Sequence, residues 1–188
     1  MDRARADVVV KRSPIAGSGV FAQRRFRAGS EIATIRNLLY SLSTLPPRMW
    51  KWAIQIGEDT FTAPAKLATW DYLNHSCQPN AGISVKGAVE HLVALRNIEP
   101  GNEITIDYST YIGQNWGWTM TCRCGERCCR RRVENFSRLP KALQRRYSRL
   151  GVVPGFLKSR EACERASAPG MNVLRLPSAF EPRRRTRA

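Results

Sequence analysis

The stretch "LNHSCQPN", residues 73–80, places one of the chain's two histidines close to a cysteine, between two asparagines. His75 and Cys77 have three interpretations: ligands of a metal ion, a nucleophile with its base, or part of a structural turn. Pro79 and Asn80 favour a turn that leads into the next element. Because these residues alone do not separate the three interpretations, the rest of the chain has to decide between them.

The other cysteines are clustered near the end of the folded part. The chain has six cysteines in 188 residues, and four of them lie in "CRCGERCC", residues 122–129. The charged stretch "MDRARADVVVKRS", residues 1–13, lacks the apolar run of a signal peptide, and no apolar run reaches the roughly 20 residues that span a bilayer. We therefore expect a soluble protein without membrane contact, cytoplasmic or, as the alternative, nuclear or nucleoid-associated. Clustered cysteines in such a protein favour metal over disulfides, with a redox pair as the alternative.

Residues 1–110 show short apolar runs between turn signals, a pattern that predicts a mainly β core. Two prolines precede an amphipathic run at residues 45–57, so we expect one short helix there. Strands are expected at residues 7–13, 18–24, 31–37, 59–65, 81–87, 89–98 and 103–109.

The last third of the chain is strongly basic. Residues 1–121 carry 13 Lys and Arg against 10 Asp and Glu, whereas residues 122–188 carry 18 against 5. Such a segment contacts nucleic acid or another polyanion, or it only promotes solubility. At residues 139–150 a stripe at helical spacing predicts a helix docked onto the domain; its members are Leu139, Leu143, Tyr147 and Leu150. Beyond Val152 the rise in Gly, Pro, Ser and Arg predicts a flexible tail.

Four segments, in this order, carry a family resemblance. They are "SPIAGSGVFAQRRFRAGSEI" (13–32), "LNHSCQPN" (73–80), "GNEITIDYS" (101–109) and "CRCGERCC" (122–129). Together they closely resemble the SET-domain protein lysine methyltransferases with a post-SET cysteine cluster, over roughly residues 8–136. The resemblance implies several small sheets with a pseudoknot and short helices. It divides the chain into a SET domain (1–121), a post-SET zinc segment (122–136), a docking helix (137–151) and a basic tail (152–188).

The resemblance also implies a site for S-adenosyl-L-methionine. In the family a glycine-containing turn approaches this cofactor through its main chain, and the matching residues are Gly17, Ser18 and Gly19. An ordinary hairpin turn is the alternative for this short motif. Asn74 and His75 match the family pair that contacts the cofactor, largely through main chain. His75 is then a hydrogen-bonded structural residue rather than the base of a cysteine nucleophile, since no downstream Asn or Asp motif would orient such a dyad.

The family pattern of cysteines implies a Zn²⁺ site. Its members here are Cys77, Cys122, Cys124 and Cys129, a closed tetrahedral structural set. A shift of register that uses Cys128 in place of Cys129 stays open.

The segment "EITIDY", residues 103–108, implies the chemistry. Its Tyr108 matches the family's catalytic tyrosine, and a channel lined by Ile106, Tyr108, Tyr111 and Trp116 would receive a lysine. For Trp116 and Tyr111 a place in the core is an equal alternative. The lysine must react as the neutral amine, although its ordinary pKa is about 10.4, and an apolar channel lowers that value.

Two positions depart from the family pattern. Ile106 stands where Phe or Tyr is common, which leaves room and predicts dimethylation or trimethylation. Asp71 stands where arginine is common. We expect a methyltransferase that acts on lysine ε-amines of a histone-like or other protein. The alternatives are a non-catalytic SET-like module whose basic tail binds nucleic acid, and a zinc-dependent redox sensor.

Overall fold

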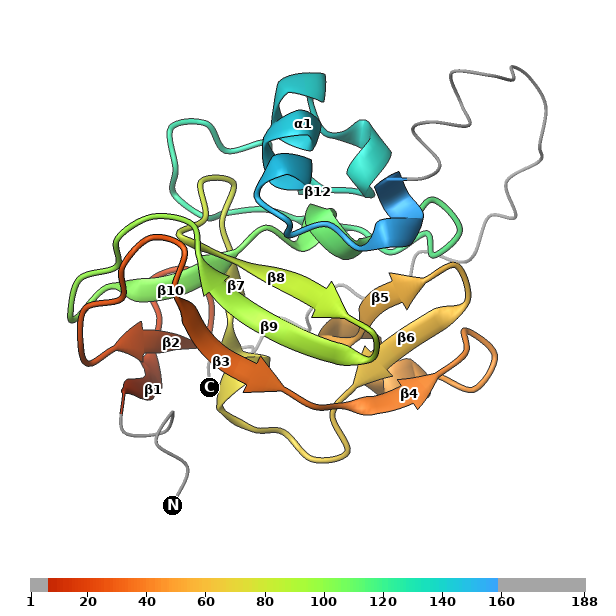
Figure 1. The fold of residues 1–188 in the computed structure, drawn as a ribbon, viewed down its shortest axis with the longest axis horizontal. Helices are drawn as coiled ribbons and strands as arrows, with labels where there is room; N and C mark the ends of the chain where they lie inside the picture. The colour runs from red at the N-terminus through yellow and green to blue at the C-terminus, as the bar shows by residue number, and fades with distance from the viewer. Residues whose placement is uncertain (1–6, 159–188) are drawn as a thin grey trace, which may run out of the picture.

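The computed structural model describes residues 7–158 (Figure 1). Its strands form four small sheets. The four-stranded sheet runs in the spatial order β1 (Val8–Arg12), β2 (Ser18–Ala22), β10 (Glu103–Ile106), β7 (Asn74–His75). The two three-stranded sheets are β3 (Glu31–Ile35), β9 (Val89–Ala94), β8 (Ala81–Lys86) and β4 (Leu38–Tyr40), β6 (Thr60–Ala63), β5 (Ile54–Gly57). The last sheet pairs β11 (Met120–Thr121) with β12 (Arg132–Val133). The predicted mainly β fold of several small sheets is confirmed.

The helices are short. Within the described residues, three 3₁₀ helices lie between the strands: η2 (Pro47–Trp52), η3 (Thr69–Tyr72) and η4 (Tyr108–Tyr111). The 3₁₀ helix η5 (Phe136–Arg138) and the α-helix α1 (Lys141–Arg149) follow the last strand, and residues 155–158 are helical as well. None of the helices within residues 7–158 is both long enough and apolar enough to cross a membrane.

One parallel pairing brings two of the sequence motifs together. Strand β7 pairs in parallel with β10, with Asn74 opposite Thr105 and His75 opposite Ile106. The amide of Ser76 continues the pairing by donating to the carbonyl of Ile106 at 3.0 Å. The segments 73–80 and 101–109 are therefore neighbours in space, as the resemblance implies.

The predicted single helix over residues 45–57 is wrong. The prolines do start a helical turn, but η2 ends at Trp52, and Ala53 is extended with φ −74° and ψ 143°. The following residues form β5 and pair with β6, where Ile54 lies opposite Thr62. The apolar spacing that looked helical comes from two adjacent elements, each of which places its own residues in the core.

The C-terminal segment packs on β8 and β9 as a second hydrophobic cluster. It contains Phe136, Leu139, Tyr147, Val152, Val153 and Leu157, with Val93 and Leu95 of the β9 region against it. In Figure 1 the segment containing α1 lies on one side of the β8–β9 ribbon. The close approach needs a glycine, because a Cβ at Gly82 would lie 2.8 Å from the Val152 side chain.

Two expectations for this segment need correction. Leu150 does not belong to the docking face, since it is 42% exposed, and Gln144 is buried in the helix instead. Residues 152–157 belong to the packed cluster, so the folded part continues past the predicted start of the tail at residue 152. Residues 159–188 of that tail lie outside the described residues.

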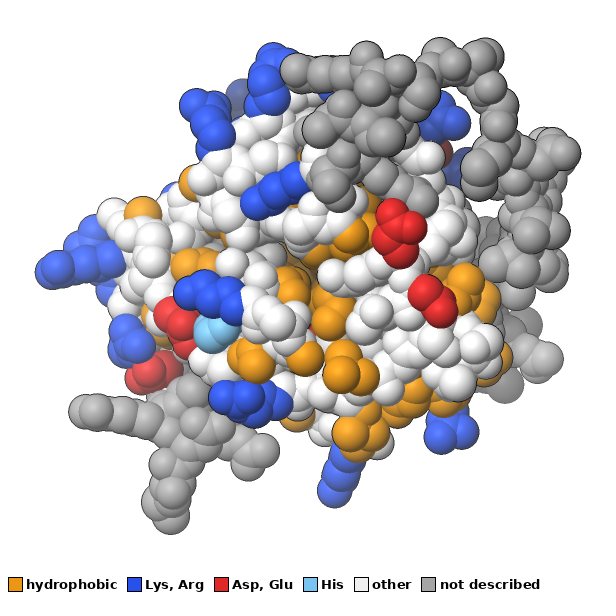
Figure 2. Space-filling model, turned by 45° about the vertical axis from the view of Figure 1, so that its right-hand side comes forward, with side chains coloured by type: hydrophobic (Ala, Val, Ile, Leu, Met, Phe, Trp, Pro, Cys, Tyr) orange, Lys and Arg blue, Asp and Glu red, His pale blue; other side chains and the backbone are white. Residues whose placement is uncertain are grey.

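The charged side chains lie mainly away from the middle of the molecule in one view. Figure 2 shows hydrophobic side chains in the middle and along the lower edge of that face, with Lys and Arg projecting mostly from its periphery. Strand β4 contributes two exposed hydrophobic residues, Leu38 and Leu39.

Candidate functional site

The side chain of Asn74 ties the Gly17–Gly19 turn to the central strands. Its Nδ2 lies 3.0 Å from the carbonyl oxygen of Ser18, 3.2 Å from that of Ala16 and 2.7 Å from Glu103 Oε1. Ser13 Oγ donates to the same Glu103 carboxylate at 2.9 Å. Because its amide hydrogens already have acceptors, Asn74 would meet a ligand at this turn through its main chain.

Glycine is favoured at positions 17 and 19 of the turn for two different reasons. Gly17 has φ +49°, in the left-handed region that glycine adopts without a Cβ penalty. Gly19 has no such conformation, but a Cβ there would clash with the Glu103 carboxylate. A side chain at Gly19 would therefore displace the Glu103 carboxylate from its hydrogen bonds with Ser13 and Asn74, whatever the turn binds.

His75 connects Tyr108 to the cysteine cluster. Its Nδ1 accepts the amide hydrogen of Tyr108 at 3.2 Å, and its Nε2 lies 3.4 Å from Cys77 Sγ. Burial lowers the pKa of His75 to about 4, against the opposing effect of the Asp107 carboxylate. The ring is therefore neutral near pH 7, and because Nδ1 accepts a hydrogen bond, the proton is on Nε2. This is the structural role expected for His75.

Asp107 joins three segments of the chain. Its fully buried carboxylate accepts from Arg130 Nη2 at 2.7 Å, from the hydroxyl of Tyr147 at 3.1 Å and from the amide of Ser109 at 3.1 Å. Arg130 lies in the cysteine segment and Tyr147 in α1. The residue before Tyr108 therefore fixes both C-terminal segments against the central strands.

Tyr108 lies where β10 ends, in the first position of η4. Its hydroxyl donates to the carbonyl of Leu73 at 2.6 Å, and its ring lies near those of His75, Tyr111 and Trp118. Burial raises the pKa of Tyr108 above its ordinary value of 10. The phenol consequently stays protonated and can orient a neighbouring group, but it is not a base near pH 7.

A cavity of about 40 Å³ opens beside Tyr108. Since a single water molecule needs a cavity volume of about 10–15 Å³, this cavity has room for a few non-hydrogen atoms. Four aromatic side chains line it, Trp52, Trp70, Tyr108 and Tyr111, together with Ile106 and the acidic residues Asp71 and Glu90. An aromatic lining with acidic groups suits an organic cation.

Trp116 has a different position. It is 1% exposed and packs edge-on against Phe61 at 5.2 Å, with Trp118 stacked at 6.1 Å, and it is not among the residues that line the cavity. Of the residues expected in a substrate channel, Ile106, Tyr108 and Tyr111 meet at the cavity, whereas Trp116 lies in the core.

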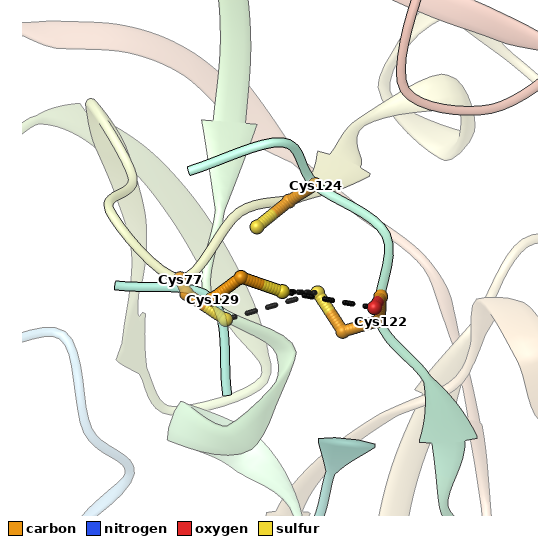
Figure 3. A group of neighbouring side chains, drawn as sticks. All are labelled: Cys77, Cys122, Cys124 and Cys129. Atoms are coloured by element: carbon orange, nitrogen blue, oxygen red, sulfur yellow. Dashed lines mark hydrogen bonds between the residues drawn. The ribbon is translucent and has the colours of Figure 1, made fainter. Parts of the chain in front are cut away.

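The four expected cysteines form one cluster (Figure 3). The sulfur atoms of Cys77, Cys122, Cys124 and Cys129 all lie within 4.8 Å of one another. Sγ of Cys122 lies 3.7 Å from that of Cys77 and 3.6 Å from that of Cys129. A tetrahedron with Zn–S distances of about 2.3 Å has edges of about 3.8 Å, so four thiolates placed this way fit a zinc ion.

Cys128 is outside this cluster. Its exposed side chain lies 3.9 Å from the carbonyl oxygen of Cys77 instead. The amide of Arg131 lowers the pKa of Cys129 to about 7, and the amide of Arg130 donates to Cys77 Sγ at 3.3 Å. Burial has the opposite effect on two neighbours: it raises the pKa of Cys77 to about 11 and raises that of Cys122 as well. Of these three thiols only Cys129 is therefore favoured as a thiolate by its surroundings alone, and a bound metal would have to displace the protons of the others.

Comparison with known proteins decides the family. Residues 17–109 match the SET domain family, a span that contains the glycine turn, Asn74, His75 and Tyr108. Residues 17–109 are a SET domain. The SET domain supplies Cys77 to the cysteine cluster, and the segment that follows it supplies the other three cysteines.

Several curated relatives share this SET domain. The chain is 29% identical over 132 residues to histone-lysine N-methyltransferase ASHH3 of Arabidopsis thaliana, covering 62% of this chain and 35% of that protein. It is 32% identical over 139 residues to human histone-lysine N-methyltransferase 2B, covering 66% and 5%, respectively. The chain thus spans well under half of the length of these relatives.

The solved structures that resemble it include KRYPTONITE in complex with mCHG DNA and SAH. The TM-score is 0.56 at 22% identity, over 68% of this chain and 29% of KRYPTONITE. This likeness concerns the fold.

Sequence reasoning missed several residues of the SET domain's cavity. Trp52 and Trp70 fall in 3₁₀ helices, and Glu90 stands at a buried position of β9, where Thr62 donates a hydrogen bond to it. The alternation of β9 carried a signal, since Glu90, Leu92 and Ala94 share its buried face. A glutamate at such a position needs an explanation.

Proposed function

We propose that this protein transfers a methyl group from S-adenosyl-L-methionine to a lysine ε-amine of another protein. The observation that carries the proposal is the parallel pairing of β7 with β10. This pairing places the Asn74–glycine turn assembly and the Tyr108–Leu73 hydrogen bond on neighbouring strands, with the cavity beside Tyr108. The proposed cofactor turn and the cavity are thus linked through two paired strands, an arrangement that supports a direct transfer between them.

The relatives support the same reaction. The curated ones are named as histone-lysine N-methyltransferases, and KRYPTONITE has been solved in complexes with SAH, one of which also contains an H3(1–15) peptide. We therefore propose a lysine in a basic, histone-like protein segment as the substrate class. Acidic side chains at the cavity, Asp71 and Glu90, are compatible with a cationic substrate.

S-adenosylmethionine supplies an electrophilic methyl group on its sulfonium. The residues of this chain have to hold the amine in line with it, neutral and free of water. Tyr108 contributes a neutral hydroxyl that the Leu73 carbonyl holds in place, and both residues line the cavity. These groups orient the amine and stabilise the developing positive charge, so their contribution is alignment and electrostatics.

We propose Zn²⁺ as the ion at the four cysteines. The cluster is closed, all of its ligands are sulfur, and its spacing fits, which are the properties of a structural zinc site. Its role would be to hold the segment 122–133 against the β7 loop. His75 would pass this restraint on to Tyr108, because its two ring nitrogens face Cys77 and the Tyr108 amide.

The number of methyl groups follows from the cavity. Ile106 lines the space with a hydroxyl-free aliphatic side chain, so we propose that the enzyme proceeds to dimethylated or trimethylated lysine. Mass spectrometry of the product at exhaustive turnover tests this. A product that stays monomethylated would contradict it.

The decisive experiment combines binding and turnover. Zinc-loaded protein is titrated with S-adenosylmethionine by calorimetry, then incubated with labelled cofactor and core histones or a proteome lysate, and the modified lysines are mapped. We expect binding and labelled lysine, with Tyr108→Phe losing about 10²–10³-fold in kcat while its fold and cofactor binding remain. Protein that neither binds the cofactor nor labels lysine would support the non-catalytic module.

A nucleic-acid contact is the second candidate function, and charge favours it. Residues 122–188 carry 18 Lys and Arg against 5 Asp and Glu. We propose that this basic part holds the enzyme on DNA or RNA. Affinity for duplex DNA should fall steeply with salt, and a chain ending at residue 158 should bind more weakly with a smaller salt slope. If both chains bind duplex DNA with equal affinity, residues 159–188 do not contribute to DNA binding.

A further inference from the structure

Glu90 is a buried carboxylate without a cationic partner. It lies on β9 with 1% of its surface exposed. Thr62 Oγ1 donates to its Oε1, and Asn37 Nδ2 lies 3.4 Å from the same oxygen. Its other oxygen, Oε2, is buried and has no hydrogen-bond partner among residues 7–158. Two neighbours thus fix the orientation of the carboxylate, and one oxygen is left for something else.

That oxygen belongs to a side chain of the same cavity as Tyr108. Glu90, Tyr108 and Tyr111 all line it, so the carboxylate, the phenol and the space for an amine form one compartment. Trp52 and Trp70 enclose this compartment with aromatic rings. A lysine side chain that reaches Tyr108 through this cavity brings its charged end into the compartment that Glu90 lines.

The charges around Glu90 favour a cation from outside. Asp71 of η3 lines the same cavity and adds negative charge, whereas Tyr108 and Tyr111 of η4 stay neutral because burial raises the pKa of each phenol. Lys51 of η2 also lines the cavity, but its Nζ lies over the Trp52 ring at 3.9 Å. Within the described part of the chain, none of the ion pairs includes Glu90. A buried carboxylate in this setting is unfavourable until a cation arrives.

We propose that Glu90 is a catalytic residue that receives the ammonium group of the target lysine and takes a proton from it. This inference rests on the proposed methyltransferase function and deepens it, since Tyr108 is protonated and cannot perform this step. Burial, with a contribution from the negative charge of Asp71, raises the pKa of Glu90. A raised pKa makes the carboxylate a stronger proton acceptor and narrows the difference from the pKa of an ammonium group.

The reaction consists of a proton transfer to Glu90 followed by a methyl transfer to the lysine nitrogen. One N–H bond of the ε-ammonium breaks and an O–H bond forms at Glu90 Oε2, which leaves the nitrogen lone pair free. That pair forms the N–C bond while the S–C bond of S-adenosylmethionine breaks, and its electrons stay on sulfur. The products are a methylammonium cation and S-adenosylhomocysteine. Glu90 then releases its proton to water, and half-exposed Asp71 lines the route at the same cavity.

The test is the pH dependence of turnover in Glu90→Gln. This variant keeps the shape and the Oε1 acceptor for Thr62, but it has no proton acceptor at Oε2. We expect kcat at pH 7.5 to fall by about 10²-fold or more. The loss should shrink at least tenfold by pH 10, where a growing fraction of the lysine arrives already neutral. Glu90→Asp, which keeps a carboxylate, should retain the pH profile of the unchanged protein at a lower kcat.

The controls separate this proposal from the function on which it rests. Glu31→Gln changes an exposed glutamate in the same sheet and should leave kcat unchanged at every pH. Tyr108→Phe should lower kcat by a similar factor at all pH values. A Glu90→Gln loss that is equally constant with pH, or an unchanged kcat, would overturn the role of Glu90. If Glu90→Gln does not fold, loss of the pH profile in folded Glu90→Asp overturns it as well. An unchanged protein that binds no cofactor and methylates no lysine would instead remove the proposed function, and this inference with it.

Discussion

Replacing Asp107 by Asn is expected to loosen both C-terminal segments at once. The carboxylate is fully buried and accepts three hydrogen bonds, from Arg130, Tyr147 and Ser109. Asparagine keeps an oxygen for some of these donors but removes the charge that faces the Arg130 guanidinium. Arg130 is itself only 17% exposed, so water replaces little of that lost interaction.

The magnitude follows from this geometry. Breaking a buried ion pair by removing one partner costs about 3–5 kcal/mol, and the partial exposure of Arg130 reduces this to about 2–4 kcal/mol for Asp107→Asn. For a chain of this size the melting temperature should fall by about 5–15 °C. Replacing Arg130 by Met leaves Asp107 buried without its cation, so the two changes should couple by at least about 1 kcal/mol in a double-mutant cycle.

The assay is urea unfolding at pH 7 in zinc-containing buffer, followed by circular dichroism. Glu134→Gln serves as the matched control, because Glu134 pairs with Arg132 at 3.7 Å on the surface and its loss should cost less than about 0.5 kcal/mol. A coupling energy below about 0.5 kcal/mol between positions 107 and 130 would refute the idea that Asp107 fastens the cysteine segment through charge.

Three further predictions concern the turn, the cysteines and the cavity. Gly19→Ala should destabilise the protein by about 1–3 kcal/mol and weaken cofactor binding, because its methyl group would clash with Glu103; unchanged unfolding curves would contradict this. Cys129→Ser should lower bound zinc from one ion per chain and lower the melting temperature, as should a chelator, whereas Cys128→Ser should change neither, as read by metal analysis and thermal unfolding. Glu90→Gln should stabilise the protein above the raised pKa of Glu90: the folded carboxyl holds its proton above the ordinary value of 4.5, so its stability contribution is present at lower pH and lost as pH rises. Unfolding free energies of the variant and the unchanged protein at several pH values check this. If the advantage of Glu90→Gln in unfolding free energy decreases as pH rises, the predicted direction of the pH dependence is wrong.

The local patterns predicted strands well where one face is buried. Strand β9 alternates over its whole length. Its neighbours β3 and β8 do not alternate strictly, and they were recognised as short apolar runs between turn signals. The local patterns failed at residues 45–57, where a 3₁₀ turn and a strand follow one another without a polar break. Both elements there bury apolar residues, so the hydrophobic spacing alone could not separate them.

The stripe on α1 shows a second kind of limit. Helical spacing placed Leu150 with Leu139 and Tyr147, but the chain turns at Gly151, and Val152 enters the cluster instead. A positive φ of 72° at Gly151 ends the helix and redirects the chain. Which side chain fills the space over Gly82 depends on this turn and on β8, which lies far away in the sequence.

For the site, the order of motifs carried most of the prediction. The sequence by itself indicated a SET domain, through its resemblance over roughly residues 8–136, and it grouped Cys77, Cys122 and Cys124 with either Cys129 or Cys128. The motifs that carry these predictions, such as Asn-His-Ser-Cys and Cys-x-Cys, are short and local. The match of residues 17–109 to the SET domain family supports the first point independently of the geometry, whereas the grouping of the cysteines is supported by the structure. The choice of Cys129 over Cys128 came from the fold, since adjacent cysteines point in different directions and only one can meet Cys122.

Only the tertiary structure decided what lines the cavity and what each polar group faces. It placed Trp116 in the core and Trp52 at the cavity, and it gave the glutamate at position 90 an oxygen without a partner within the described residues. The physical reason is that burial and charge are properties of neighbours. Thr62 donates to Glu90, and Asp71 and Tyr108 line the same cavity, each from a different element. No local stretch of sequence therefore contains the information that the glutamate at position 90 is buried at this cavity.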